Sequence, residues 1–178
     1  MRVASLAKIV AVFAVVAALL PMQALSARHV QRHSALATLQ SGVLYKLNLI
    51  RKAHGLVPLK LNSSLSAAAA QHSNEMVADG YFAHNSFDGS AFWKRIQRFY
   101  PSVQYRSWSV GENLLWEAGN LDAKRALEMW MASPEHKANI LTARWREIGI
   151  AAVSKSGAPG VYGGSAVTVV ATDFGTRA

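Results

Sequence analysis

The order of the secondary-structure patterns along the chain most constrains what it can fold into. Helical patterns come first, and two strand patterns at residues 148–153 and 166–172 come near the carboxyl end, joined by a loop rich in Gly and Pro at residues 157–164. No internal repeat is present. Runs of helices and runs of strands are typical of an α+β domain rather than of a regularly alternating α/β chain. We therefore predict one domain with a sheet covered by helices, either an α+β or a sandwiched α/β domain.

The amino-terminal segment has the layout of a secretory signal peptide. Arg2 and Lys8 give a positive start, an apolar run follows at residues 9–20, and small residues at 24–27 offer a cleavage site. The apolar run is too short to suit a transmembrane helix. We predict that residues 1–26 are removed as a signal peptide; an uncleaved anchor is the alternative. No later segment is long and apolar enough to span a membrane.

Cleavage after Ser26 leaves 152 of the 178 residues. That length is sufficient to bury a sizeable core without disulfides. We assign residues 27–43 to a mature amino-terminal segment that includes the start of the first helix, and residues 44–175 to a folded domain. Residues 27–33 are polar and basic, and we expect them to be loose.

Composition excludes some kinds of protein. The chain has no cysteine, so it has neither disulfides nor a thiolate site. Its net charge of +9 falls to +7 when Arg2 and Lys8 are removed, which favours contact with acidic envelope polymers or lipid head groups. Because the basic residues are dispersed, a solubilising surface is the alternative. The densest basic cluster, at residues 94–98, is too small to indicate nucleic-acid binding. We expect a secreted or periplasmic protein.

The helical patterns have clear ends. The first covers residues 34–54 and stops at Gly55, and the second begins at a cap at Asn62 or Ser63 and stops at Gly80. His72 lies on the apolar face of the second helix, where a lone histidine is more often a hydrogen-bonded core residue than a ligand. Two further helices are predicted at residues 91–99 and from a cap at Asp122.

Polar residues stand out in two places between these helices. The loop at residues 81–89 has an unusual density of turn formers, and we expect Asp88 and Arg95 to pair behind His84. Residues 103–110 form a rough edge-strand pattern. The next residues place Glu112 and Asn113 in an otherwise apolar run, where a carboxylate needs a partner because burying it unpaired is expensive.

A helix–helix corner is predicted at residues 130–141. Ser133 is a good N-cap, and Pro134 suits the first position of a helix. Glu135 then falls in the first turn, where a carboxylate suits the helix dipole. His136 follows, so a titratable imidazole is held at a fixed corner just after Trp130.

Several short motifs follow one another in a recognisable order. They are Leu47-Asn48-x-x-Arg51, Gly55-Leu56-x-Pro58-Leu59, Ala70-x-His72-Ser73-x-x-Met76, Phe82-x-His84-x-Ser86, Gly111-Glu112-Asn113, Trp130-x-x-Ser133-x-x-His136-x-x-Asn139-Ile140-Leu141 and Ile148-Gly149-Ile150. Together they resemble the CAP superfamily of cysteine-rich secretory, antigen 5 and pathogenesis-related proteins, also called the SCP-like extracellular domain. The resemblance covers residues 44–175 and, with its lack of cysteine, is similar to bacterial members.

The resemblance implies an α–β–α sandwich with a central, mostly antiparallel sheet. It also implies a cleft lined by two histidines and one or two glutamates, which in some members holds a divalent metal. By motif, His84 and His136 match the histidines and Glu112 matches the glutamate of the Gly-Glu-Asn motif. The position of the second glutamate is Ser133 here, and we expect the adjacent Glu135 to point elsewhere.

Two explanations of these three residues remain open. His84, Glu112 and His136 form a reasonable ligand set for a divalent metal, with zinc the most natural ion and one position left for water. The alternative is a hydrogen-bonded network in which Glu112 is an acceptor between the two imidazoles.

The functional interpretation follows from the same residues. We favour a binding module for lipid, envelope or protein partners. The alternative is a metal-dependent or His/Glu-based, peptidase-like hydrolase, in which His84 or His136 is a general base oriented by Glu112. No Gly-x-Ser-x-Gly nucleophile motif is present, and we assign no catalytic residue.

Overall fold

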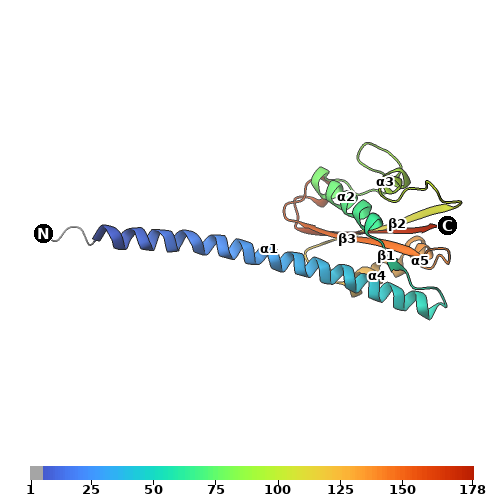
Figure 1. Ribbon diagram of the computed structural model, residues 1–178, viewed down its shortest axis with the longest axis horizontal. Helices are drawn as coiled ribbons and strands as arrows, with labels where there is room; N and C mark the ends of the chain where they lie inside the picture. Colours follow the sequence, from blue (N-terminus) through green and yellow to red (C-terminus); the bar gives the residue numbers. More distant parts are fainter. Residues whose placement is uncertain (1–5) are drawn as a thin grey trace. The chain divides into compact units, whose positions relative to one another are not determined.

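The computed structural model describes the backbone of residues 6–178 and the side chains of residues 27–178. The side chains of the predicted signal peptide, residues 1–26, therefore lie outside the described residues. The chain divides into two compact units, Met1–Ala35 and Leu36–Ala178, and each is described by itself. The first unit holds most of one long helix, α1, and the second holds the remaining elements (Figure 1).

Five helices and four strands follow one another along the described chain. The helices are α1 (Leu6–Ala53), α2 (Ser63–Asp79), α3 (Phe92–Phe99), α4 (Ala123–Ala132) and α5 (Pro134–Ile140). The strands are β1 (Lys60–Leu61), β2 (Trp108–Ala118), β3 (Glu147–Lys155) and β4 (Val167–Arg177), with a short 3-10 turn at Gly160–Tyr162.

Residues 27–33 are helical, so our prediction that they are loose was wrong. The sequence has no Gly or Pro between residues 22 and 41, so nothing in it interrupts a helix that continues from the first turn of α1. In the second unit, α1 buries Leu39, Val43 and Leu47, which recur at the spacing of one helix face.

The four strands form one sheet in the order β1-β3-β4-β2. Strand β4 is antiparallel to both β2 and β3, and only the two-residue β1 is parallel to its neighbour β3. This confirms a mostly antiparallel sheet. Strand β1 was not predicted, because two residues are too few to show alternation.

The prediction for β2 placed the strand too early. Residues 103–107 lie in turns and bends, and the strand begins at Trp108 and continues to Ala118. Glu112 and Asn113 are therefore strand residues, paired in register with Asp173 and Thr172 of β4. The alternation was hard to recognise because both faces of the sheet are covered, so consecutive residues of β2 are buried.

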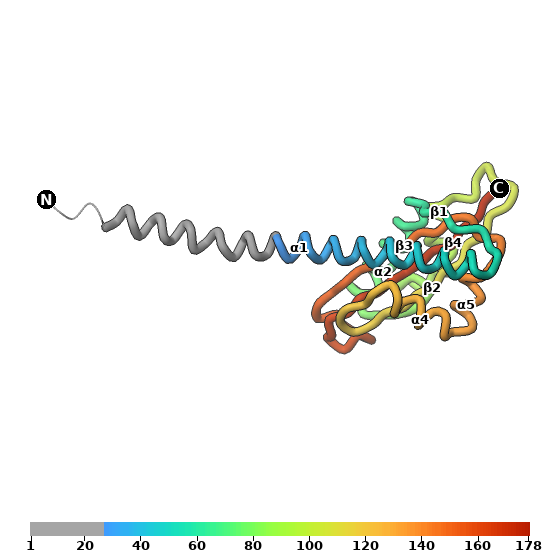
Figure 2. Tube along the Cα trace, turned by 90° about the horizontal axis from the view of Figure 1, so that it is seen from below, coloured from blue at the N-terminus to red at the C-terminus, as the bar shows by residue number. Residues whose placement is uncertain are grey.

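Helices cover both faces of the sheet, which confirms the α–β–α sandwich (Figure 1). Val169 and Ala171 of β4 pack with α2 on one face, whereas Val170 and Phe174 pack with α1, α4 and α5 on the other. The backbone of α2 crosses β3 so closely that a Cβ atom at Gly149 would lie 2.0 Å from the carbonyl carbon of Leu65. The tube view in Figure 2 shows the same elements from below.

The predicted helix ends are confirmed where they depend on local chemistry. Asn62 and Asp122 accept capping hydrogen bonds from Leu65 and Arg125, and Gly80 ends α2 with a φ of 74°. Helix α3 is an exception, because its N-cap residue, Ala91, makes no side-chain capping hydrogen bond. Within the residues whose side chains are described, no helix combines the length and apolar character needed to cross a membrane.

Candidate functional site

The candidate site lies at the free edge of the sheet. Strand β2 is the outermost strand, so residues from both helical layers reach around it. The loop after α2 and the start of α3 approach from one face, and α5 approaches from the other. They enclose a cavity of about 360 Å³ lined by His84, Phe92, Gly111, Glu112, Asn113, Glu135, His136 and Asn139. The three residues predicted from the motifs are therefore brought to one cavity.

His84 is held by a single contact to the strand. Its Nδ1 atom lies 2.8 Å from Oε1 of Glu112, and its side chain is 52% exposed. When Nδ1 donates this hydrogen bond, the other ring nitrogen, Nε2, is an acceptor available to the cavity. The geometry thus orients one imidazole and leaves its second nitrogen for a ligand or a water molecule.

Glu112 is more constrained than His84. Its carboxylate is completely buried, and its second oxygen, Oε2, accepts a hydrogen bond from the guanidinium of Arg95, which is also completely buried. The same guanidinium donates to Oγ of Ser86 at 3.1 Å. Both oxygens of Glu112 are thus occupied, one by an imidazole and one by a permanent cation.

Arg95 is the functional residue that the sequence interpretation missed. We expected it to pair with Asp88, but the Asp88 carboxylate instead accepts a hydrogen bond from the backbone N–H of Ser90 at 2.9 Å. The spacing of α3 contained the signal: Arg95 lies three residues after Phe92 and next to the buried Ile96, so it falls on the inward face. A buried arginine needs a buried carboxylate, and Glu112 is that partner.

Behind Glu112, a second acid lies under the α2 layer. Asp173 is fully buried, and neither of its carboxyl oxygens accepts a hydrogen bond from the described residues. Burial, and then the neighbouring Glu112 carboxylate, raise the pKa of Asp173 well above its usual range. A protonated Asp173 fits this position, because its own hydrogen can be donated towards Glu112.

His72 belongs to the same buried region, as predicted, rather than to the cavity. Its Nε2 atom lies 2.8 Å from the carbonyl oxygen of Ala83, so it fixes the loop that carries His84. Burial lowers the pKa of His72, with a smaller opposing contribution from Glu112. His72 is therefore a neutral core residue that positions the loop.

The other side of the cavity is held by α5. Ser133 caps the helix by accepting from the backbone N–H of His136 at 3.5 Å, as the sequence predicted. The carbonyl oxygen of His136 accepts from the Asn113 side chain at 3.1 Å, and Asn139 donates to Asn113 at 2.9 Å. Burial, followed by the proximity of His84, lowers the pKa of His136. The His136 imidazole is thus predominantly neutral at neutral pH.

Glu135 also lines the cavity, so our expectation that it points elsewhere was wrong. It is exposed and lies at the rim, where its charge partly opposes the lowering of the pKa of His136. It does not replace the second glutamate of the family motif in the buried part of the cleft.

The donor set does not match a preformed metal site. Among the described side chains, no group of three or more His, Cys, Asp or Glu residues is arranged to hold a metal ion. At Glu112, a metal ion would compete with His84 and with the buried Arg95 for the carboxylate oxygens. The network predicted from the sequence had Glu112 between two imidazoles, whereas the structure places Glu112 between the imidazole of His84 and the guanidinium of Arg95.

A second, apolar cavity adjoins the first. It has a volume of about 310 Å³ and is lined by Phe82, Leu114, Leu115, Trp116, Met129, Trp130, Ser133 and His136. Its wall is anchored by Trp130, which is 1% exposed and donates from Nε1 to the carbonyl oxygen of Leu114 at 3.1 Å. His136 lines both cavities, so a polar chamber and an apolar chamber meet at one imidazole.

A three-layered sandwich with a His/Glu cleft at its sheet edge is the architecture that the motifs predicted. Residues 44–170 match the family of cysteine-rich secretory proteins, CAP. The chain belongs to this family.

Individual relatives agree with the family assignment. The chain is 28% identical over 117 residues to YkwD, an uncharacterized protein of Bacillus subtilis, in an alignment covering 66% of this chain and 43% of YkwD. It is thus similar to less than half of that protein's length.

Two solved structures have a similar fold. An extracellular protein of Bacillus anthracis that contains an SCP domain is 25% identical, with a TM-score of 0.56 over 78% of this chain and 42% of that one. An outer surface protein of Borrelia burgdorferi is 19% identical, with a TM-score of 0.58 over 76% of this chain and 90% of that one.

Proposed function

We propose that this chain is an exported binding module, and that its cleft holds a single-chain amphiphile with an uncharged, hydroxyl-bearing head group. The observation that carries the proposal is that His136 lines both the polar and the apolar cavity. One ligand can therefore place its head in the first chamber and its chain in the second. Each chamber lies at the lower end of the volume range of small-molecule sites.

The polar chamber suits hydroxyl groups. Imidazole nitrogens of His84 and His136 and the side-chain amide of Asn139 line it, and together such groups both donate and accept. A hydroxyl group needs both kinds of partner. The exposed carboxylate of Glu135 at the rim disfavours an anionic head at neutral pH. A glycerol or sugar head group fits this chemistry better than a phosphate.

The apolar chamber suits an acyl chain. Aromatic and aliphatic side chains dominate its lining, and Met129 and Trp116 are only partly buried there, so an occupant would cover exposed apolar surface. Covering such surface stabilises a complex by about 25 cal/mol per Å² of apolar area. The family resemblance is consistent with an envelope or lipid partner.

The test is calorimetric titration of the mature protein with monomyristoylglycerol below the concentration at which it self-associates. We expect saturable binding that weakens about tenfold, or about 1.4 kcal/mol, in His136→Ala and in Met129→Trp, which fills the apolar chamber. His54→Ala, which changes an exposed histidine directly after α1, is the matched control and should bind like the parent. Absence of binding by a folded parent protein would contradict the proposal.

A second function, hydrolysis of the bound amphiphile, has one observation in its favour. The 2.8 Å contact between Nδ1 of His84 and Glu112 orients the imidazole as a general base would need. The two nearby serines have structural roles instead, since Ser86 accepts from Arg95 and Ser133 caps α5. A hydrolase would therefore have to activate water through Nε2 of His84.

Turnover of monomyristoylglycerol to glycerol and myristate distinguishes the two functions. Hydrolysis that disappears in His84→Ala, while binding persists, would support the enzyme. Binding without release of myristate would support the binding module.

Export is the remaining part of the proposal. Its support is the signal-peptide layout of residues 1–26 together with the family assignment. Mass spectrometry of the exported protein should give the mass of a chain beginning at Ala27. A protein that retains residues 1–26 would support the uncleaved anchor instead.

A further inference from the structure

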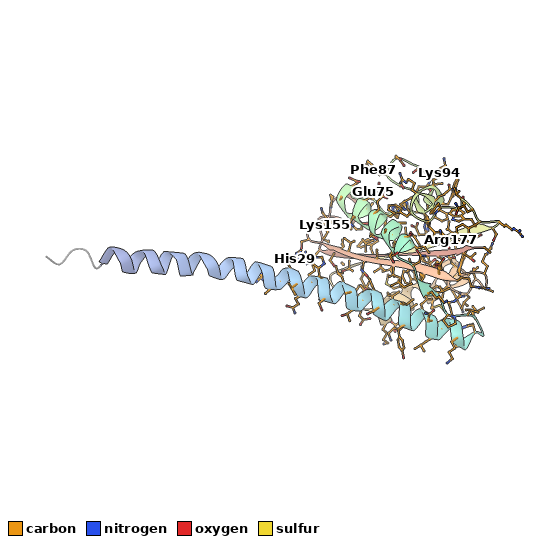
Figure 3. The ribbon with its side chains drawn as sticks, in the orientation of Figure 1. His29, Glu75, Phe87, Lys94, Lys155 and Arg177 are labelled. Atoms are coloured by element: carbon orange, nitrogen blue, oxygen red, sulfur yellow. The ribbon has the colours of Figure 1, made fainter. Side chains whose placement is uncertain are left out.

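Two histidines on α1 form an exposed pair outside the region that matches the family. His29 and His33 lie one helical turn apart, with their Nε2 atoms 3.0 Å apart and their rings in an edge-to-face arrangement 4.3 Å between centroids. Both side chains are exposed, and Figure 3 labels His29 on α1. Neither the cleft nor the proposed amphiphile site uses them.

The predicted cleavage after Ser26 gives His29 a second property. The mature chain would begin Ala27-Arg28-His29, so a histidine would be its third residue. A free α-amino group, the two following backbone amide nitrogens and Nδ1 of a third-position histidine can surround one ion in three fused chelate rings. Four nitrogens in one plane are the environment that Cu²⁺ and Ni²⁺ prefer, whereas zinc favours a tetrahedral one.

The backbone amides needed for this chelate are released by cleavage. In α1, the N–H groups of Arg28 and His29 lie four residues after residues 24 and 25, whose carbonyl groups are their helical hydrogen-bond partners. Cleavage after Ser26 removes these carbonyl groups together with the signal peptide. The first four N–H groups of any helix have no partner within it, and terminal residues fray readily. The new amino terminus can thus offer these two amide nitrogens to an ion without losing a hydrogen bond that they donate.

We propose that the mature amino terminus binds one Cu²⁺ or Ni²⁺ ion through the α-amino nitrogen of Ala27, the amide nitrogens of Arg28 and His29, and the His29 imidazole. The site rests on the proposed cleavage after Ser26. Binding releases to solvent the amino-group proton and the two amide protons, so affinity falls as pH falls. The ion site is independent of His84, Glu112 and His136.

The His29–His33 pair defines the competing arrangement. Two imidazole nitrogens 3.0 Å apart match adjacent ligand positions on an ion about 2.0–2.1 Å from each. Such a pair supplies two nitrogens on an intact helix, whereas the amino-terminal chelate supplies four and needs no ligand from solvent in its plane. The chelate is therefore the stronger arrangement, and His33 is not required for it.

The test is a titration of the exported, processed protein with CuCl₂ in the presence of excess glycine as a competing chelator. We expect one ion per chain and the visible absorption band of Cu²⁺ in a plane of four nitrogens, at shorter wavelength than that of Cu²⁺ bound by two imidazoles. His29→Ala should abolish this band. A single Gly placed before Ala27 should also abolish it, because His29 then becomes the fourth residue.

His33→Ala is the matched control and should retain the band. Loss of binding in His33→Ala with retention in the Gly-extended chain would overturn the chelate in favour of the helix pair. Absence of the band in a parent protein whose mass shows Ala27 at its start would also overturn it, as would a mass that places the amino terminus elsewhere. Titration with monomyristoylglycerol is unaffected by these changes, so the two proposals fail separately.

Discussion

The guanidinium of Arg95 and the carboxylate of Glu112 form an ion pair in which both side chains are completely buried. Arg95 comes from α3 and Glu112 from the edge strand β2, so the pair joins the helical layer to the sheet directly behind the cleft. Because His84 binds the other oxygen of Glu112, the pair also determines where that imidazole points.

Removing the cation of this pair should be severely destabilising. We expect Arg95→Met to lower the free energy of unfolding by about 3–5 kcal/mol, because it leaves the Glu112 charge buried and uncompensated. Arg98→Met, which changes an exposed arginine of the same helix, is the control and should change stability by less than about 0.5 kcal/mol. Urea unfolding measures both. If Arg95→Met and Arg98→Met lowered the free energy of unfolding by equally small amounts, the buried pair would not be a major stabilising contact.

The double variant Arg95→Met/Glu112→Met tests whether the two side chains stabilise the protein as a pair. Replacing both partners removes the buried charges together, so the double variant should be more stable than Arg95→Met alone. If it were less stable than either single variant, the two side chains would act independently.

Asp173 should be a site where a substitution stabilises the protein. Burial raises its pKa, so ionising it at neutral pH next to Glu112 is unfavourable. Asp173→Asn keeps the shape and removes the need to take up a proton on folding, so we expect about 1–3 kcal/mol of added stability at neutral pH. Since the native pKa is raised, the stability that Asp173 contributes is present at low pH and is lost as pH rises.

The advantage of Asp173→Asn over the parent should therefore grow as pH increases. Thermal unfolding of both proteins from pH 4 to pH 8 tests this trend. A variant that is less stable than the parent at every pH would show that the carboxyl group makes a contact that the amide cannot replace.

Helix caps could be predicted from the sequence, whereas contacts between residues far apart in the chain could not. The caps Asn62, Asp122 and Ser133 depend only on neighbours three residues away; Asp122 and Ser133 were predicted, and Asn62 was one of two candidates for its helix. By contrast, Asp173 meets Glu112 only because β4 lies beside β2 in one register, which no local pattern specifies.

The cleft shows the same division. The motifs indicated which histidines and glutamate gather there, because their order matches a family. They did not indicate which groups bond to each oxygen of Glu112. The contact with Arg95 depends on how α3 packs, because Arg95 lies on the inward face of that helix. The boundary of β2 was missed for a related reason: with both faces buried, its residues do not alternate between apolar and polar.

Protonation of His72 should destabilise the protein in mild acid. Burial lowers its pKa below the usual 6.5, so the native state resists a proton that the unfolded chain accepts. The stability that depends on neutral His72 is present above the unfolded pKa and is lost as pH falls from 6.5 through the native pKa. His72→Gln, whose amide can still donate to the carbonyl of Ala83, should weaken this pH dependence.

The measurement is the urea midpoint at several pH values from 7.5 down to 5. The matched control is His54→Gln, in which an exposed histidine is replaced. The expectation fails if the parent and His72→Gln lose stability in parallel over this range while both remain folded at pH 7.5.

Divalent zinc should not stabilise the protein through the cleft. The two oxygens of Glu112 already bind His84 and Arg95, so a zinc ion would compete with both of them for the carboxylate. We expect an excess of ZnCl₂ to leave the melting temperature unchanged in a His29→Ala background, which removes the separate site proposed at the amino terminus. A zinc site of the folded state would raise the free energy of unfolding by about 2.7 kcal/mol at a free zinc concentration 100 times its dissociation constant. A zinc-dependent rise in melting temperature that His84→Ala and His136→Ala each abolish would contradict the hydrogen-bonded network and restore the metal site.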